Sequence, residues 1–146
     1  MNQLFEMFGP GLVMLISLIG VLLGISVARP SVVGFMRRCK RENKPIPWIV
    51  LVFLAAPTVG AVYSFILMQR MFEVTLTPEN EGILLNYSVG VGLITAIAMI
   101  VIGKLGEIAC KNSDITEKSL NSHFIKIGAV NSIALFAMVF AMINLP

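Results

Sequence analysis

Four long runs of apolar residues are the feature that most constrains the fold of this chain. They cover about 8–28, 46–68, 82–103 and 125–145. Each run has about the 20 residues that an α-helix needs to cross the hydrocarbon core of a bilayer. None shows the strict alternation of a membrane β-barrel strand, so the backbone polar groups must be satisfied within helices. The sequence therefore predicts an all-α integral membrane protein with four transmembrane helices.

The composition agrees with a membrane protein and gives no support to a soluble enzyme. The 146 residues are 57% hydrophobic and only 13% charged, and the mean hydropathy is +0.88. A soluble domain of this size is less apolar. The sequence has no glycine-rich phosphate loop, no paired carboxylates within a run and no nucleophile beside a base. We therefore predict no catalytic residues, no cofactor and no metal site.

The basic residues are unevenly distributed between the connecting segments, and this predicts the orientation. Lys and Arg gather in 29–45 and 104–124, whereas the connection between the second and third runs contains only Arg70 among Lys and Arg. By the positive-inside rule, the basic loops 29–45 and 104–124 are cytoplasmic and both termini lie outside. The net charge of +3 then reflects orientation in the bilayer, and no binding to nucleic acid is expected.

The two halves of the chain resemble each other weakly when the sequence is shifted by half its length. Gly9 then falls on Gly82, and the apolar runs and basic connections superpose in order. This predicts two duplicated helical hairpins, residues 1–73 and 74–146. The alternative is that any two apolar hairpins would align this well.

The first and third runs carry small residues four positions apart, which form a stripe along a helix and allow another backbone to approach closely. They are Gly20, Gly24 and Ala28 in the first run and Ser88, Gly92 and Ala96 in the third. Two interpretations remain open, namely packing within one bundle and packing into a crowded ring. The second and fourth runs are bulkier, as expected of helices further from a crowded axis.

Polar residues at membrane depth are the candidates for a functional site. Asn131 lies about a third of the way into the last run, and Pro57 interrupts the second run just before Thr58 and Tyr63. A buried uncharged amide either packs against another helix or holds an ion. A hydroxyl beside a proline can bond to a freed carbonyl, so a structural role is favoured for Thr58.

With these features the chain resembles the four-helix proteolipid, or K/c, subunit of V-type and A-type rotary ATPases. The resemblance covers nearly the whole chain in length, topology and hairpin order. The local matches are the glycine pattern of the first run, Pro57 followed by Tyr63-Ser64-Phe65, and Gly103-Lys104. Membership would imply a homo-oligomeric rotor ring, in a bacterial inner membrane, that contacts a membrane stator subunit and a central-stalk subunit. The transported ion would be H⁺ or Na⁺, and ATP would be hydrolysed by other subunits.

The resemblance also implies an ion-carrying glutamate, which this chain lacks. The family's glutamate position falls on Asn131, and of the other ion ligands only Tyr63 is retained. The remaining ligand positions fall on Val59, Gly60 and Ile102. An asparagine has no titratable group, so it cannot alternate between a neutral loaded state and an anionic empty state. Asn131 and Tyr63, with Thr58, are therefore the candidate ion-binding residues of a divergent copy that is not expected to carry the ion by the usual mechanism.

Two other functions remain open. The chain could be a small four-helix transporter or channel component in which Asn131, Thr58 and Tyr63 line a polar path. It could also be a non-transporting membrane scaffold whose basic segment 37–44 binds anionic lipid or a partner. Membrane orientation alone is a sufficient reason for the charge of that segment.

Overall fold

The structure is a bundle of long helices. The computed structural model describes the backbone of residues 2–74, 77, 79–112 and 117–145, and the side chains of 9–74, 77, 79–111 and 120–145. The helical elements are α1 (Asn2–Arg41), α2 (Trp48–Ala55), the 3₁₀ turn η1 (Ala56–Thr58), α3 (Val59–Phe72), α4 (Glu81–Asn112) and α5 (Glu117–Asn144). No strand occurs among the described residues.

Four helical segments within the described chain are long and apolar enough to cross a membrane. They are Gly9–Arg41, Trp48–Phe72, Glu81–Lys111 and Leu120–Asn144. The second of these combines α2, η1 and α3. The predicted all-α class with four membrane-spanning helices is thereby confirmed.

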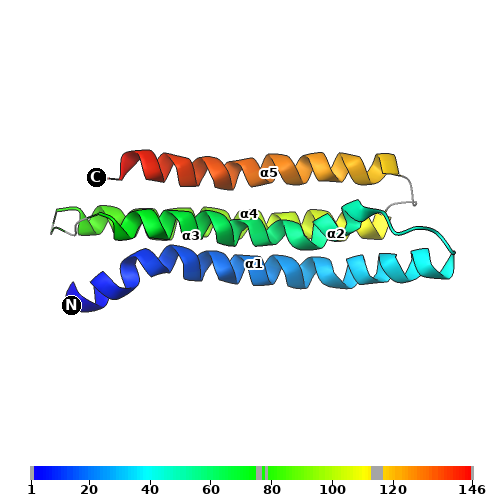
Figure 1. Cartoon of the computed structure of the whole chain (residues 1–146), viewed down its shortest axis with the longest axis horizontal. Helices are drawn as coiled ribbons and strands as arrows, with labels where there is room; N and C mark the ends of the chain where they lie inside the picture. Colours follow the sequence, from blue (N-terminus) through cyan, green and yellow to red (C-terminus); the bar gives the residue numbers. More distant parts are fainter. Residues whose placement is uncertain (1, 75–76, 78, 113–116, 146) are drawn as a thin grey trace.

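The helices lie side by side along one long axis (Figure 1). Both ends of the chain and the connection between α3 and α4 lie at one end of the bundle. The connection from α1 to α2, the end of α4 and the start of α5 lie at the opposite end, which we call the basic end because it carries the Lys and Arg residues of 29–45 and 104–112.

At the basic end the helices are longer than predicted, and the prediction of loops is wrong for 29–41, 104–112 and 117–124, which are helical. Helix α1 continues to Arg41, so only 42–47 connects it to α2. Helix α4 continues to Asn112 and α5 begins at Glu117, while 113–116 lie outside the described residues.

The extension of α1 has a clear physical reason. Ala28, Val32, Phe35 and Cys39 are fully buried and follow one another at spacings of four, three and four, so they form one face of a helix. This face packs into the main hydrophobic core, with Cys110 of α4 among its neighbours. The buried face therefore outweighs the helix-breaking tendency of a proline in this stretch.

Helix α1 ends through local backbone geometry. Asn43 adopts a left-handed conformation with φ of 52°. The backbone N–H of Lys44 donates to the carbonyl oxygen of Cys39 at 2.9 Å, and the N–H of Asn43 donates to that of Lys40 at 3.4 Å. This is the pattern of a Schellman helix end, in which a residue such as Asn takes the left-handed position.

Helices α1 and α4 are in backbone contact through their small residues. A methyl group built on Gly20 would overlap the backbone of Ala96, and one on Gly24 would overlap the carbonyl of Met99. From the other side, a methyl group on Gly103 would overlap the backbone of Gly24. The two helices approach this closely only because these positions lack side chains.

The second span is interrupted around Pro57, as its sequence suggests. The chain passes from α2 through the 3₁₀ turn Ala56–Thr58 into α3, and Pro57 is buried. The Thr58 hydroxyl donates to the carbonyl oxygen of Ala55 at 2.6 Å. This bond gives a partner to a carbonyl beside the interruption, which is the structural role favoured for Thr58.

We expect Gly24→Ala to weaken the bundle. The added methyl group meets the backbone of α4, which cannot move aside, so the free energy of unfolding falls by roughly 1–3 kcal/mol. The matched control is Gly34→Ala on the same helix, where nothing lies within 4 Å of an added methyl group. It should shift stability by less than about 1 kcal/mol. Unfolding by SDS in mild detergent measures both, and equal effects would contradict the close contact.

Candidate functional site

The candidate site joins α3 and α5 through two neutral side chains. The amide Nδ2 of Asn131 donates to the hydroxyl oxygen of Tyr63 at 3.0 Å. Both side chains are half-buried. The other amide atom, Asn131 Oδ1, is buried and has no hydrogen-bond partner among the described residues. The pair therefore leaves one oxygen unused at membrane depth.

Thr58 does not join this pair. Its side chain is exposed, and its hydroxyl is bonded to Ala55 within its own helix. Of the three predicted ion-binding residues, the structure brings together Asn131 and Tyr63 and leaves Thr58 apart. A polar path formed by all three residues is not present within this single chain.

The one acid that lies well inside a spanning segment is already paired. Glu107 accepts hydrogen bonds from Lys104 at 2.7 Å and from Lys111 at 2.6 Å, all on α4. The Glu107 side chain is 15% exposed. A carboxylate held by two lysines of its own helix is not available to bind a cation beside Asn131.

Helix α3 makes a polar contact with each of the other three long helices. Ser64 donates to Ser17 of α1, and the Ser88 hydroxyl of α4 lies 3.3 Å from the sulfur of Met71. The bond between Tyr63 and Asn131 is the third contact. Interhelical polar contacts of this kind hold helices together where lipid gives no hydrophobic driving force.

The predicted packing residues all lie on buried faces. Gly20, Gly24 and Ala96 form the contact between α1 and α4 described above. A methyl group on Gly92 would lie 3.1 Å from Cβ of Ile16, again between α4 and α1. Ala28 is fully buried, and Ser88 faces α3. The small residues are thus used between helices of one chain.

Sequence reasoning missed three buried hydroxyls. Ser17 and Ser64 bond to each other, and Thr95 of α4 is fully buried with a hydroxyl that has no partner among the described residues. A signal for Ser17 was available, because it lies three positions before Gly20 and so continues the small-residue stripe. Thr95 gives the same signal, because it lies three positions after Gly92, and Ser64 lies four positions after Gly60.

No metal site is formed by the residues that the structure describes. Nowhere in this part of the chain do three His, Cys, Asp or Glu side chains gather as ligands. The oxygens of Tyr63 and Asn131 carry no charge, so the pair is a weak ligand set for a cation by itself.

The comparisons with known proteins identify no family. No family model matches the chain, and no curated protein matches it in sequence. The resemblance to rotary ATPase proteolipids therefore depends on individual residues and on topology.

We expect Tyr63 and Asn131 to be energetically coupled. Tyr63→Phe and Asn131→Leu each remove the bond, so the double variant should lose less stability than the sum of the single variants, by about 0.6 kcal/mol and at most about 1.7 kcal/mol. SDS unfolding of all four proteins measures this coupling. As a control, Ser132 bonds within its own helix to Gly128, so Ser132→Ala should not couple to Tyr63→Phe. Additive effects at Tyr63 and Asn131 would contradict the contact.

Proposed function

We propose that this chain is a rotor-ring proteolipid subunit of a V-type rotary ATPase, in a copy that does not itself carry the ion. Many copies form a ring in the membrane, and the complete complex moves H⁺ or Na⁺ past a membrane stator subunit. The chain has no catalytic role, because other subunits hydrolyse ATP. Its location is the bacterial inner membrane.

The observation that supports this proposal most directly is the bond between Tyr63 and Asn131. These residues are 68 positions apart in the sequence, and they fall on two positions that hold the ion in the resembled family. They meet 3.0 Å apart, between the second and fourth spans. A chance similarity gives no reason for these two positions to meet.

The packing of the spans is a second support. The first and third spans are joined backbone to backbone, and large apolar side chains of the fourth span remain exposed in the single chain. The most exposed of these are Ile125, Phe136, Phe140 and Ile143. The first and third spans have small side chains where they meet, and the second and fourth spans have larger side chains. Helices with this difference in side-chain size fit around a ring axis, with the small residues nearest the axis. Exposed apolar surface of this extent must be covered by lipid or by neighbouring copies.

The role of Asn131 follows from its chemistry. Ion transport by a ring needs a group that is neutral when loaded and charged when empty. The Asn131 amide is neutral in both conditions and already donates to Tyr63. The amide keeps a polar contact between α3 and α5. A charged carboxylate at the same position would need a cation or another positively charged partner. The copy therefore completes the ring without adding an ion site.

The proposed orientation places the basic end in the cytoplasm, towards the central stalk, and both termini outside. The excess of Lys and Arg at that end favours this orientation under the positive-inside rule.

Native mass spectrometry of the full-length protein in mild detergent tests the ring. We expect one large species that contains many copies, because a closed ring has no unpaired faces. A population made only of monomers or dimers, at protein concentrations where helices remain folded, would refute the rotor-ring proposal.

A second experiment tests the position of Asn131. We expect Asn131→Glu to react with dicyclohexylcarbodiimide near neutral pH, because burial raises the pKa of a carboxyl group and keeps it protonated. The conservative control Asn131→Gln has no carboxyl and should show no reaction at this position. Peptide mass mapping detects the adduct. If Asn131→Glu gives no more adduct than Asn131→Gln, the position is not equivalent to a buried ion-carrying carboxyl.

A further inference from the structure

We propose that the basic end of α1 carries a binding site for the phosphate headgroup of an anionic phospholipid. This site goes beyond the rotor function, because it concerns the lipid that surrounds the chain and not the movement of an ion. It is expected whether or not the chain assembles into a ring.

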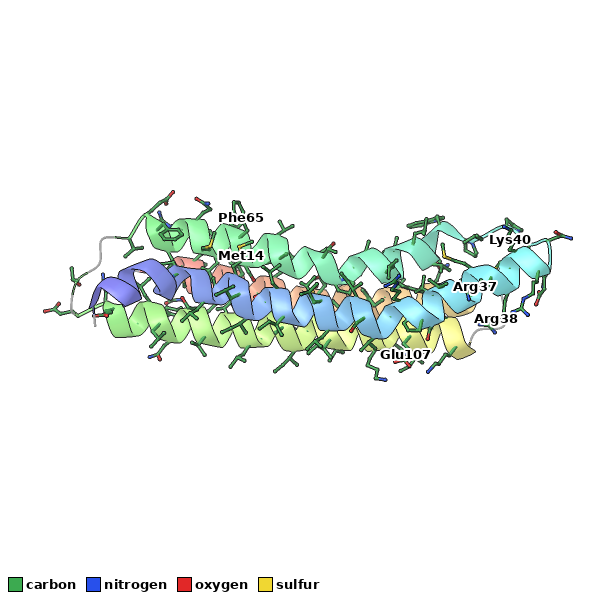
Figure 2. All side chains as sticks on the ribbon, turned by 90° about the horizontal axis from the view of Figure 1, so that it is seen from below. Met14, Arg37, Arg38, Lys40, Phe65 and Glu107 are labelled. Atoms are coloured by element: carbon green, nitrogen blue, oxygen red, sulfur yellow. The ribbon has the colours of Figure 1, made fainter. Side chains whose placement is uncertain are left out.

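The site consists of two adjoining hollows on α1, of about 480 and 540 Å³. Both hollows are lined by Pro30 and Gly34, whose small size leaves space between the arginines. Arg38 and Arg41 line one hollow, and Arg29 and Arg37 line the other. Figure 2 shows Arg37 and Arg38 near the same end of α1. We call this surface the arginine groove.

Gly34 keeps the arginine groove open. A methyl group built on Gly34 would meet nothing within 4 Å, whereas one on Gly24 would collide with α4. Space therefore remains next to Gly34, and Cys110 and Lys111 of α4 border the same hollow on its other side. Gly34 is therefore not needed for a close contact between helices, and the absence of a side chain at this position leaves space for a ligand.

Arg38 is held in place by two contacts. Its Nη2 donates to the carbonyl oxygen of Cys110 at 2.5 Å, and its guanidinium lies over the ring of Phe35, with Cζ 5.5 Å from the ring centre. A guanidinium has five N–H donors in a fixed plane. The donors that Cys110 does not use remain available to phosphate oxygens, and the side chain is already oriented.

The acids nearby do not neutralise the arginines. Glu42 pairs with Lys44 at 2.8 Å, and the hydrogen bond from Lys44 holds the pKa of the Glu42 carboxyl below its usual range. Glu107 pairs with Lys104 and Lys111. In the described part of the chain, no carboxylate lies within 4 Å of a nitrogen of the four groove arginines. The charges of Arg38 and Arg41 also help to lower the pKa of Glu42, less than Lys44 does, so the groove keeps an excess of positive charge that attracts an anion.

The position of the groove selects a lipid as the source of the phosphate. It begins where the first apolar run ends, and Val33 lines it beside Arg37. At the same end, the exposed Trp48 packs edge-on against Phe124 with ring centres 6.4 Å apart, and aromatic residues of this kind gather at the membrane interface. The phosphate group of a phospholipid at this depth can bind the arginines, while the acyl chains of the same lipid lie along the apolar side of α1.

The test measures binding of phosphatidylglycerol to the full-length protein by native mass spectrometry. Zwitterionic phosphatidylcholine and inorganic phosphate are the comparison ligands. One variant, Arg37→Gln with Arg38→Gln, removes one arginine from each hollow. The control, Lys104→Gln with Lys126→Gln, removes the same charge from α4 and α5. A third variant, Gly34→Leu, fills the groove and keeps every charge.

We expect phosphatidylglycerol to bind the arginine variant roughly tenfold or more weakly than the unmodified chain, because one charge-assisted hydrogen bond contributes about that factor. We expect a loss of similar size in Gly34→Leu, because the added side chain occupies the space that the phosphate would fill. The lysine control should keep its affinity. Equal losses in the arginine variant and the lysine control would show attraction by general charge and overturn the proposal. Unchanged binding to Gly34→Leu would also overturn it. Displacement of phosphatidylglycerol by an equal concentration of inorganic phosphate would assign the groove to free phosphate.

Discussion

The close approach of α1 and α4 is the contact on which the rest of the bundle depends. Lipid tails are as apolar as the side chains, so burial from water does not drive these helices together. They are held where Gly20 and Gly24 allow backbones to touch, and where single polar groups meet. Helix α3 supplies such a group towards each of the other long helices, the last of them through Tyr63. The position of Asn131 is thus a consequence of the packing as much as of its own chemistry.

The sequence was sufficient for the number and class of the helices but not for their ends. The apolar runs identified the spans because the bilayer fixes the length that a span must have. The basic residues after the first apolar run suggested a loop, whereas the buried residues from Ala28 to Cys39 show that the helix continues. That spacing was visible in the sequence. It was outweighed by the usual meaning of basic residues beside a span.

The candidate site was less predictable from the sequence than the number and class of the helices. The meeting of Tyr63 and Asn131 was implied by the resemblance to a family and by the alternative of a shared polar path, but no spacing rule relates residues so far apart in the chain. The separation of Thr58 follows from local chemistry, since its hydroxyl has a nearer acceptor in Ala55. The bond between Ser17 and Ser64 could not be predicted, because it requires the relative rotation of α1 and α3.

The continuation of α1 beyond its apolar run changes what the basic end offers to other molecules. At about 1.5 Å per residue, the 40 residues of α1 extend over roughly 60 Å, about twice the thickness of the hydrocarbon core. A flexible loop would lose conformational freedom each time it bound a partner. A helical projection with a continuous core presents the same shape before and after binding. The basic end is therefore a rigid extension of the bundle. A force applied to it outside the bilayer is transmitted to the helices within the membrane.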